Sequence, residues 1–310
     1  MKMGLFAPKL ERSWSISTDT RENGRYIIEE IVDSILFQLS EYNAEIRNLK
    51  GIGIGVPGPV SDSRIVHGCV NIGWETVDLK EEMQNELALK TGMDPEDFRI
   101  AAANDANAAA LGEMWLGAGK RYKNLVFVTL GTGVGGGMIV NGNILNGSVG
   151  AAGEIGHIYC GCEEWIEGCC SCGSCGCLEQ IASAGGIVHV AEKLVRQEEK
   201  TSILKEVWKE RGQLTAKDIL DAGRAGDSLA DDAVEIVSMY LGRGIASVCA
   251  VLNPECVLIG GGVSAAGEYL RAKIERHFRA QAFHVLKDTP IGLAELGNSA
   301  GMAGAAKLLL

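Results

Sequence analysis

The sequence predicts an α/β protein of two lobes, and three observations support this prediction. First, 310 residues exceed the usual size of one domain and suit two. Second, hydrophobic residues make up 46% of the chain and charged residues 22%, a composition that excludes a disordered chain. Third, strand-like and helix-like segments alternate along the chain, which indicates a partly parallel sheet.

The first hundred residues contain short β-like runs and stretches in which apolar residues recur at helical spacing. Ile27, Ile31 and Ile35 lie on one such helical face. Pro57-Gly58-Pro59 stops the strand before it, because proline and glycine end regular structure. The expected elements are strands at 2–6, 13–18, 51–56 and 98–103 and helices at 27–39 and 79–90.

The remaining residues continue the alternation of strands and helices. An Ala-rich helix begins after Asn104-Asp105, and a later strand ends in a glycine-rich turn over 131–137. No fixed-period repeat or Pro/Ser linker is present, so we expect structured segments to join the lobes. The expected strands are 124–130, 138–141 and 255–259, and the expected helices are 105–115, 184–198, 215–223, 228–252, 267–281 and 299–309.

Acidic residues dominate the charge of the chain. There are 40 Asp and Glu residues against 29 Lys and Arg residues, and the formal net charge is -11. No block of Lys and Arg occurs, so we expect no nucleic-acid partner. The N-terminal apolar run is too short for a secretory signal and no long stretch is free of glycine and charge. We therefore expect a cytoplasmic protein with no membrane partner.

Seven of the ten cysteines lie between residues 160 and 177, a distribution typical of a local metal site rather than a disulfide framework. His157, Cys170, Cys172 and Cys177 supply one imidazole and three thiolates, the ligand set of a closed tetrahedral zinc site. The ligands could also be chosen differently, or a site of cysteines alone could form. An iron–sulfur cluster fits the spacing poorly. The remaining cysteines of the segment are Cys160, Cys162, Cys169 and Cys175.

Two glycine-rich turns and one Asn-Asp pair follow predicted strands. Glycines at 131–137, with the Thr132 hydroxyl, and at 260–262 could let the backbone approach a polyphosphate, but a tight hairpin and close strand–helix packing need glycine too. Asn104-Asp105 stands where a strand gives way to a helix. There it could cap the helix, or Asp105 could act as a general base that takes a proton from an attacking hydroxyl group.

Two glutamates bracket the cysteine-rich segment. Glu154 precedes His157 by three residues, and Glu179 follows Cys177 by two. Either glutamate alone could be an ordinary exposed residue. A metal ion that orders the segment would also fix both carboxylates, and preorganised acceptors are what recognition of several sugar hydroxyl groups requires.

Taken together, these residues resemble the ROK family of sugar kinases and sugar-responsive regulators, within the actin-like ATPase (ribonuclease H-like) fold group. The resemblance covers nearly the whole chain. It rests on Gly55-Val56-Pro57-Gly58-Pro59, Asn104-Asp105, the 130–136 segment, Glu154-Ile155-Gly156-His157, the 170–179 segment and Gly260-Gly261-Gly262.

The resemblance implies a two-lobed fold and a set of site residues. The lobes would be 1–103, with a C-terminal helix at 297–310 packing back on it, and 104–296 with the zinc-binding loop. Asp105 would be the catalytic base. The substrate-binding residues would be Asn71, Asn104, Asp105, Glu154, His157 and Glu179. The nucleotide would bind at Gly131, Thr132, Gly133, Gly135, Gly261 and Gly262, and the metal ligands would be His157, Cys170, Cys172 and Cys177.

The implied reaction is ATP-dependent phosphorylation of a hexose, with glucose at its 6-hydroxyl as the first expectation. ATP and Mg²⁺ would take part in the reaction, Zn²⁺ would be structural, and the protein would be a homodimer. Two alternatives stay open. One is a kinase for another hexose or an N-acetylated amino sugar, and the other is a sugar-binding regulator with little kinase activity.

The sequence departs from the family pattern in two places. The interval between His157 and Cys170 carries Glu163, Glu164, Trp165 and extra cysteines, which resembles a small insertion. At the start, the family has a strand and an Asp-x-Gly-Gly-Thr phosphate loop, whereas residues 2–6 here resemble the strand that follows them. We therefore expect the first strand and its phosphate loop to be missing, and a kinase that is weak or unstable.

Overall fold

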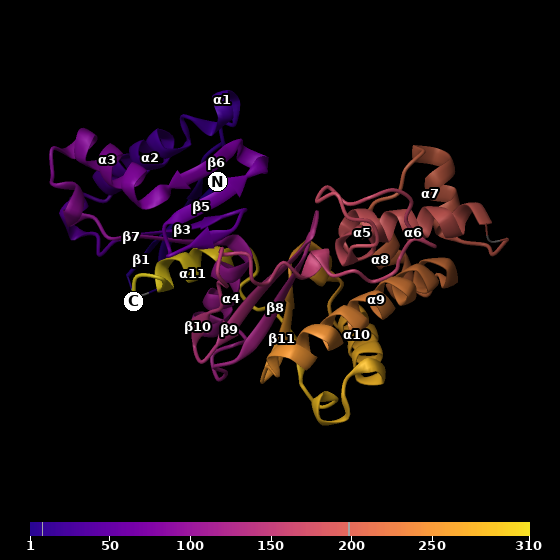
Figure 1. The fold of residues 1–310 in the computed structure, drawn as a ribbon. Helices are drawn as coiled ribbons and strands as arrows, with labels where there is room; N and C mark the ends of the chain where they lie inside the picture. The colour runs from indigo at the N-terminus through magenta and orange to yellow at the C-terminus, as the bar shows by residue number, and fades with distance from the viewer. Residues whose placement is uncertain (8, 198) are drawn as a thin grey trace. The chain divides into compact units, whose positions relative to one another are not determined.

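The structure, a computed structural model, describes residues 1–7, 9–197 and 199–310, and its contacts group the chain into two compact units. Unit 1 comprises Met1–Arg121, Gly137–Ala152 and Asn298–Leu310, and unit 2 comprises Tyr122–Gly136 and Gly153–Gly297. Strands and helices alternate in both, so the predicted α/β class is confirmed (Figure 1). The predicted lobe boundary after residue 103 stays a prediction.

Unit 1 holds three small sheets covered by helices. Its strands are β1 (Lys2–Phe6), β2 (Leu10–Ser15), β3 (Ile52–Val56), β4 (Val60–Ser61), β5 (Ile65–Cys69), β6 (Trp74–Asp78), β7 (Ile100–Asn104) and β10 (Asn143–Ile144). Its helices are α1 (Arg21–Gly24), α2 (Ile27–Glu41), α3 (Leu79–Thr91), α4 (Asp105–Leu116) and α11 (Ala300–Lys307). Helices α2 and α3 lie side by side, and their apolar faces close a core with β5, β6 and β7 (Figure 1).

The pairing of these strands corrects two sequence predictions. Strand β2 covers Leu10–Ser15 rather than 13–18, because Lys2 pairs with Ser15 and Leu5 with Arg12 in an antiparallel ladder. Residues 60–78 form an antiparallel sheet β4-β5-β6 that sequence reasoning missed. Strands β3 and β7 are parallel to each other and form a sheet separate from β1-β2.

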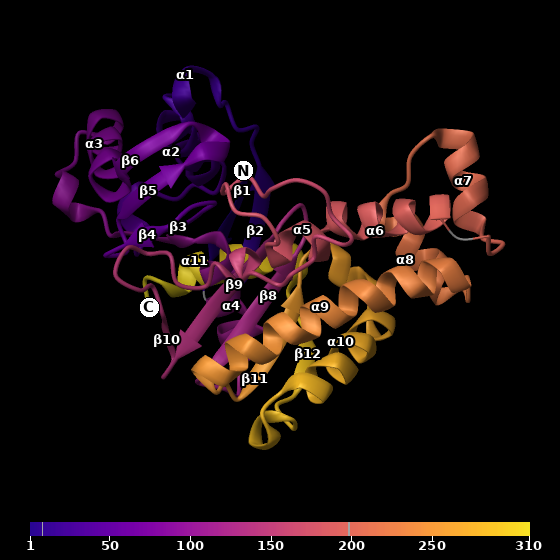
Figure 2. The same cartoon turned by 45° about the vertical axis from the view of Figure 1, so that its right-hand side comes forward.

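Unit 2 is mostly helical around three adjacent parallel strands. Its strands are β8 (Leu125–Leu130), β11 (Cys256–Gly260) and β12 (Ile291–Leu293), and its helices are α5 (Leu178–Ala182), α6 (Ala184–Gln197), α7 (Ile203–Arg211), α8 (Ala216–Arg224), α9 (Ser228–Leu252) and α10 (Glu268–Gln281). Helices α5 and α7 and strand β12 were not expected, and residue 198 of the predicted helix 184–198 lies outside the described residues. Figures 1 and 2 show α9 and α10 side by side.

A five-stranded sheet has the order β10-β9-β8-β11-β12, in which β8, β11 and β12 are parallel. Strand β9 covers Val134–Val140, so the predicted glycine turn over 131–137 is only three residues long. The later glycines lie in the strand because neighbouring backbone comes close. A Cβ atom at Gly136 would lie 2.4 Å from the Gly153 carbonyl oxygen. Close packing of neighbouring backbone, rather than approach to a polyphosphate, therefore explains the glycine at position 136.

Helix α9 is the one helix among the described residues that is long and apolar enough to cross a bilayer. Its most apolar window is 61% buried within the protein. Buried residues follow its length, among them Leu229, Val237 and Ile245. This burial is typical of the core helix of a soluble protein.

Glycines hold α11 against α4 at backbone contact distance. A Cβ atom at Gly304 would lie 1.6 Å from the Ala108 carbonyl oxygen, and one at Gly112 would lie 2.1 Å from the Ala300 oxygen. On the sheet side, a Cβ at Gly53 would lie 1.8 Å from the Ala305 oxygen. Helix α11 therefore fits between α4 and β3 only because these positions lack side chains.

We expect Gly304→Ala to lower the free energy of unfolding by about 1–3 kcal/mol or more, because the added methyl group must push two backbones apart. The matched control is Gly301→Ala in the same helix, where a Cβ atom would meet nothing within 4 Å. That variant should gain up to about 1 kcal/mol from alanine's better helix propensity. Urea denaturation measures both, and equal effects of the two variants would contradict the close-contact explanation.

Candidate functional site

Asn104 and Asp105 lie at the junction of β7 and α4 in unit 1. The Asn104 side-chain oxygen accepts hydrogen bonds from the backbone N–H groups of Ala106 at 2.9 Å and Asn107 at 3.2 Å. Its amide group donates to the Gly58 carbonyl at 3.3 Å. Asn104 is therefore the N-cap of α4, and Asp105 does not serve as the N-cap.

The Asp105 carboxylate is at the first helical position and keeps solvent-exposed surface. One of its oxygens accepts a hydrogen bond from the Ala106 N–H at 2.8 Å. The surrounding protein partly desolvates the carboxyl group, and this raises its pKa above the usual 3.8, although backbone hydrogen bonds act in the opposite direction. An exposed carboxylate with a raised pKa is suited to accept a proton.

The end of β5 lies near Asp105, and it leads into the segment that carries Asn71. Burial raises the pKa of the Cys69 thiol, with a smaller contribution from the negative charge of Asp105. The Cys69 thiol donates to the Pro57 carbonyl at 3.2 Å. Asn71 follows in a short 3₁₀ turn, Val70–Ile72, and its side chain is exposed.

Gly58, named in the sequence analysis only as part of a motif, lies against the Asn104 side chain. Its carbonyl accepts the Asn104 amide, and a Cβ atom at this position would lie 2.9 Å from the Gly68 carbonyl oxygen. The signal was present in the Pro57-Gly58-Pro59 turn, whose two prolines fix the loop that Asn104 contacts.

In unit 2, the structure brings together the four predicted metal ligands. One donor atom from each of His157, Cys170, Cys172 and Cys177 lies within 4.8 Å of the other three. The Cys172 and Cys177 sulfurs are 3.7 Å apart, and Cys170 Sγ is 3.7 Å from His157 Nδ1. Two thiolates bound about 2.3 Å from one tetrahedral ion would be about 3.8 Å apart. The donor set and its spacing therefore fit zinc.

The other cysteines of the segment have different environments. Cys169 and Cys175 form a disulfide bond, so the segment holds one local disulfide together with the group of metal-ligand candidates that its cysteine distribution predicted. Burial raises the pKa of both Cys160 and Cys162, and the Cys162 thiol donates to the Cys177 carbonyl at 3.7 Å. Among the described residues, neither belongs to the four-donor group.

His157 and Glu154 face each other beside this group. With Nδ1 toward Cys170, the other ring nitrogen, Nε2, lies 3.9 Å from a Glu154 carboxylate oxygen. The exposed fractions of the two side chains are 37% and 45%, so both can reach a ligand in solution. A carboxylate beside the free nitrogen of a metal-bound histidine commonly orients the ring.

Glu179 joins the cysteine-rich segment to the glycine turn. One carboxylate oxygen, Oε2, accepts the Val134 N–H at 3.1 Å, and the other, Oε1, lies 3.8 Å from Cys170 Sγ. A Cβ atom at Gly133 would lie 2.1 Å from Oε2, so any larger residue there would displace the carboxylate. This contact explains one glycine of the turn, and sequence reasoning had no local signal for it.

The remaining glycines of the two turns fall into two kinds. Gly261 has φ of +84°, and a Cβ there would lie 2.3 Å from the Leu130 carbonyl oxygen, so the fold itself requires glycine. A Cβ at Gly131 or Gly262 would meet nothing within 4 Å, so packing does not explain these glycines and the space beside them is open. Thr132 is exposed, whereas Gly135 lies in β9 rather than in the turn.

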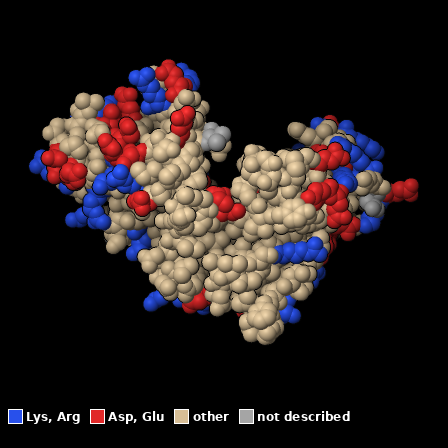
Figure 3. Space-filling view, viewed as in Figure 1, with Lys and Arg blue, Asp and Glu red and all other residues tan. Residues whose placement is uncertain are grey.

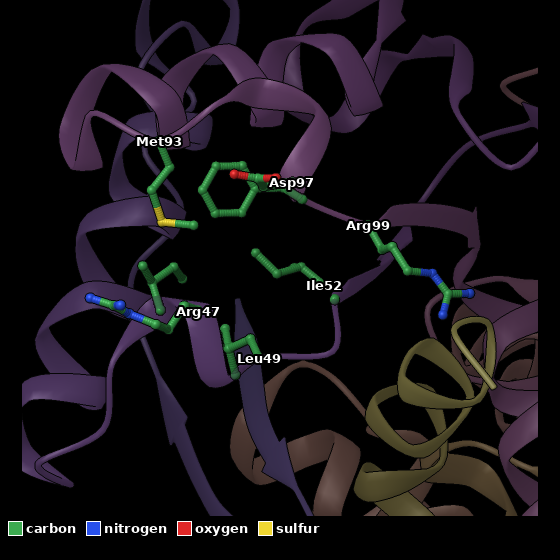
Figure 4. A pocket seen from close by; sticks show the side chains of 9 residues that line it. Arg47, Leu49, Ile52, Met93, Asp97 and Arg99 are labelled. Carbon is green, nitrogen blue, oxygen red and sulfur yellow. The ribbon is translucent and has the colours of Figure 1, made fainter.

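A cavity of about 330 Å³ in unit 1 lies away from these residues. Ile52 and Arg99 line it, at the amino-terminal ends of β3 and β7, whereas Asp105 follows the carboxyl end of β7. A five-residue strand separates the two ends by about 16 Å. Leu49, Ile52 and Met93 surround the space and the Arg99 guanidinium points away from it (Figure 4). None of the sequence-predicted site residues lines this cavity.

Charges of both signs are interspersed on the face of the molecule that Figure 3 shows. On this face, the described Lys and Arg residues form no continuous basic stripe of the kind that tracks a nucleic-acid backbone.

Comparison with known proteins gives consistent results. The model of the ROK family matches residues 11–310. The chain is 43% identical to a glucokinase of Halalkalibacterium halodurans over 96% of this chain and 87% of the relative. It is 32% identical to a xylose repressor of Caldicellulosiruptor bescii, over 77% of this chain but 58% of the repressor.

A solved structure gives the same assignment. The fold resembles a ROK family glucokinase from Streptomyces griseus in complex with glucose and AMPPNP, with a TM-score of 0.74 and 30% sequence identity, over 97% of this chain and 92% of that chain. The actin-like fold that the sequence predicted is confirmed by this similarity.

We expect purified protein to contain one zinc ion per chain and Cys172→Ser to lose most of it, because three remaining donors leave the ion incompletely held. Elemental analysis of protein prepared without chelator measures this. Cys160→Ser is the control, since Cys160 is outside the four-donor group, and it should keep its zinc. Full zinc content in Cys172→Ser, or no zinc in the parent protein, would contradict the assignment.

Proposed function

The chain belongs to the ROK family, and from this premise we propose that it catalyses ATP-dependent phosphorylation of glucose to glucose 6-phosphate. The observation that carries the proposal is the state of Asp105. Its carboxylate is exposed, it is not needed as the helix N-cap, and its raised pKa suits a general base. A glucokinase similar to the chain over 96% of its length supports the substrate.

In this mechanism Asp105 takes the proton from the sugar 6-hydroxyl as that oxygen attacks the terminal phosphorus of ATP. The new bond joins this oxygen to phosphorus, the bond from phosphorus to the bridging oxygen breaks, and ADP leaves with that oxygen. Desolvation raises the pKa of the Asp105 carboxyl group, which strengthens its carboxylate as a base.

We propose that polar side chains hold the sugar. Glu154, His157 and Glu179 would supply acceptors and a ring nitrogen, and Asn71 and Asn104 would supply amides. The Asn104 oxygen already caps α4 and one amide hydrogen is donated to the Gly58 carbonyl, so its contribution to sugar binding would come from the second amide hydrogen. Carboxylates that accept from sugar hydroxyl groups give directional recognition.

The glycine turns are the proposed nucleotide site. The open space at Gly131 and Gly262 lets a phosphate or nucleoside approach the backbone, and the Thr132 hydroxyl and the Gly133 backbone lie in the same turn as Gly131. Gly261 supports Gly262 by its contact with Leu130, whereas Gly135, within β9, is a weaker candidate. Mg²⁺ bound with ATP would neutralise phosphate charge.

Zinc is proposed as a structural ion. His157 and three cysteines would complete four-coordination, which leaves no open position for a substrate. The ion would order the cysteine-rich segment and, with it, Glu154 and Glu179 at either end. His157 would then serve both the metal and the sugar.

The regulator hypothesis is favoured by one observation, the similarity to a xylose repressor. The chain spans 58% of that protein, so the match does not include all of the repressor. We also propose that the protein is a cytoplasmic homodimer with no nucleic-acid or membrane partner. The net charge of -11 supports the absence of a nucleic-acid partner, and the burial of α9 supports the absence of a membrane partner.

A panel of sugars tests the substrate. We expect ADP release, coupled to an NADH-linked assay, to give a higher kcat/KM with glucose than with mannose, fructose, N-acetylglucosamine or N-acetylmannosamine. Binding of a sugar by calorimetry without ADP release from ATP would favour the regulator. Preference for an N-acetylated sugar would contradict glucose as the substrate and leave the kinase reaction intact.

We expect Asp105→Asn to lower kcat at least about 100-fold, the low end for loss of a positioned base. Sugar binding should persist, because the amide keeps the shape of the side chain. Stability at pH 7 should be unchanged or higher, since a folded-state pKa above the unfolded value means that the ionised form weakens folding. A variant that unfolds but keeps its specific activity would contradict this role.

The raised pKa of Asp105 also predicts how the activity of the parent protein depends on pH. Because the base must be ionised, kcat/KM for glucose should fall as pH drops through the folded pKa of Asp105, which lies above the usual 3.8. The fall should therefore begin at a higher pH than an unperturbed aspartate would give. Rates measured across the acid range in buffers of constant ionic strength provide the check, and an acid limb at or below the ordinary value would oppose it.

A further inference from the structure

The disulfide between Cys169 and Cys175 encloses part of the proposed metal site. Both cysteines are exposed, and the span between them contains the metal-ligand candidates Cys170 and Cys172. The backbone within the span folds back on itself, because the Cys170 N–H donates to the Ser174 carbonyl at 2.8 Å. The disulfide therefore closes the neck of a small turn that presents two of the four donors.

The same two cysteines could compete for the metal when reduced. Cys169 is adjacent to Cys170, and Cys175 is two residues before Cys177. Thiolates are the form of cysteine that binds zinc, and a disulfide sulfur carries no such charge. While they are joined, Cys169 and Cys175 cannot bind the metal. The turn then contains no free thiol other than those of the four-donor group.

We propose that Cys169 and Cys175 are a reversible thiol–disulfide pair that controls how tightly the cysteine-rich segment holds its metal. The disulfide form retains the ion, and the dithiol form releases it faster. This inference rests on the zinc site proposed above, and it adds a modification site that the kinase reaction does not use.

The chemistry is thiol–disulfide exchange with an external dithiol. One thiolate of the reductant attacks a sulfur of the Cys169–Cys175 bond, forms a mixed disulfide and releases the other cysteine as a thiolate. The second thiolate of the reductant then displaces the first cysteine and becomes part of a new disulfide. Two electrons pass to the protein, two protons from solvent complete its thiols, and the reverse sequence oxidises the pair. Both cysteine residues are exposed, which gives the reagent access to the disulfide.

The effect on the metal follows from chain entropy. When an ion dissociates, a turn whose neck is cross-linked samples fewer conformations than an open one, so Cys170 and Cys172 stay closer to the positions that bind it. In the reduced form the turn opens more widely, and two extra thiols offer the ion a partial, less ordered ligand set. Both effects speed loss of zinc from the dithiol form.

The test uses the full, zinc-loaded protein equilibrated with either reduced or oxidised dithiothreitol. Mass spectrometry after alkylation reports whether Cys169 and Cys175 are joined or both alkylated. Transfer of zinc to the chelating dye 4-(2-pyridylazo)resorcinol reports retention. We expect the reduced protein to lose zinc at least about fivefold faster, a modest fraction of the effect that closing a loop can have.

Variants separate the pair from the other cysteines. Cys175→Ser and, independently, Cys169→Ser should lose zinc at one rate in both buffers, near that of the reduced parent protein. Cys160→Ser, outside the pair, should keep the redox dependence of the parent. Circular dichroism checks that each variant is folded, and two single variants ensure that one misfolded protein does not decide the result.

Equal release rates in the two buffers would overturn the proposal, as would redox dependence that persists in both serine variants. Failure to detect the joined cysteines in oxidised dithiothreitol, or absence of zinc from both forms, would also overturn it. Glucose phosphorylation measured on the same samples separates this inference from the proposed function. Activity with equal release rates would refute only the redox pair, and redox-dependent release without phosphorylation would refute only the kinase.

Discussion

The Glu179 carboxylate is the contact on which the arrangement of unit 2 depends. It receives the Val134 N–H on one oxygen and lies beside the Cys170 sulfur on the other, so it joins the cysteine-rich segment to the glycine turn. Gly133 makes room for it. A hydrogen bond to a charged acceptor is stronger than one between neutral groups, and it fixes the start of β9 relative to α5. A change in the position of the cysteine-rich segment would therefore also move the glycine turn, the proposed nucleotide site.

A comparable constraint acts in unit 1, where backbone contact replaces a polar bridge. Gly304 and Gly112 allow α11 to lie directly on α4, and α4 begins at Asp105. Asn104 caps the same helix and also reaches the Gly58 carbonyl. The proposed base is thus held at the start of a rigid helix that is fixed at its N-terminus by a side chain and along its length by another helix.

The sequence allowed accurate prediction where the signal is local. The core helices α2, α9 and α10 showed their apolar spacing, and the four metal donors lie within 21 residues of one another, so their convergence needed no knowledge of distant contacts. Strands β4 and β5 were missed because they are short and antiparallel partners stabilise them. Pairing between strands, rather than the strand preference of their own residues, defines them. The two kinds of glycine in the turns could be separated only once the neighbours Glu179 and Leu130 were known.

The claim that the metal segment positions the glycine turn through Glu179 is tested most directly by amide hydrogen exchange at Val134. Its N–H donates to the carboxylate, so exchange reports this hydrogen bond itself. In zinc-loaded protein the Val134 amide should be protected, and removal of zinc should speed its exchange while amides in β11, such as that of Leu258, stay protected. Equal protection of Val134 with and without zinc would contradict the account.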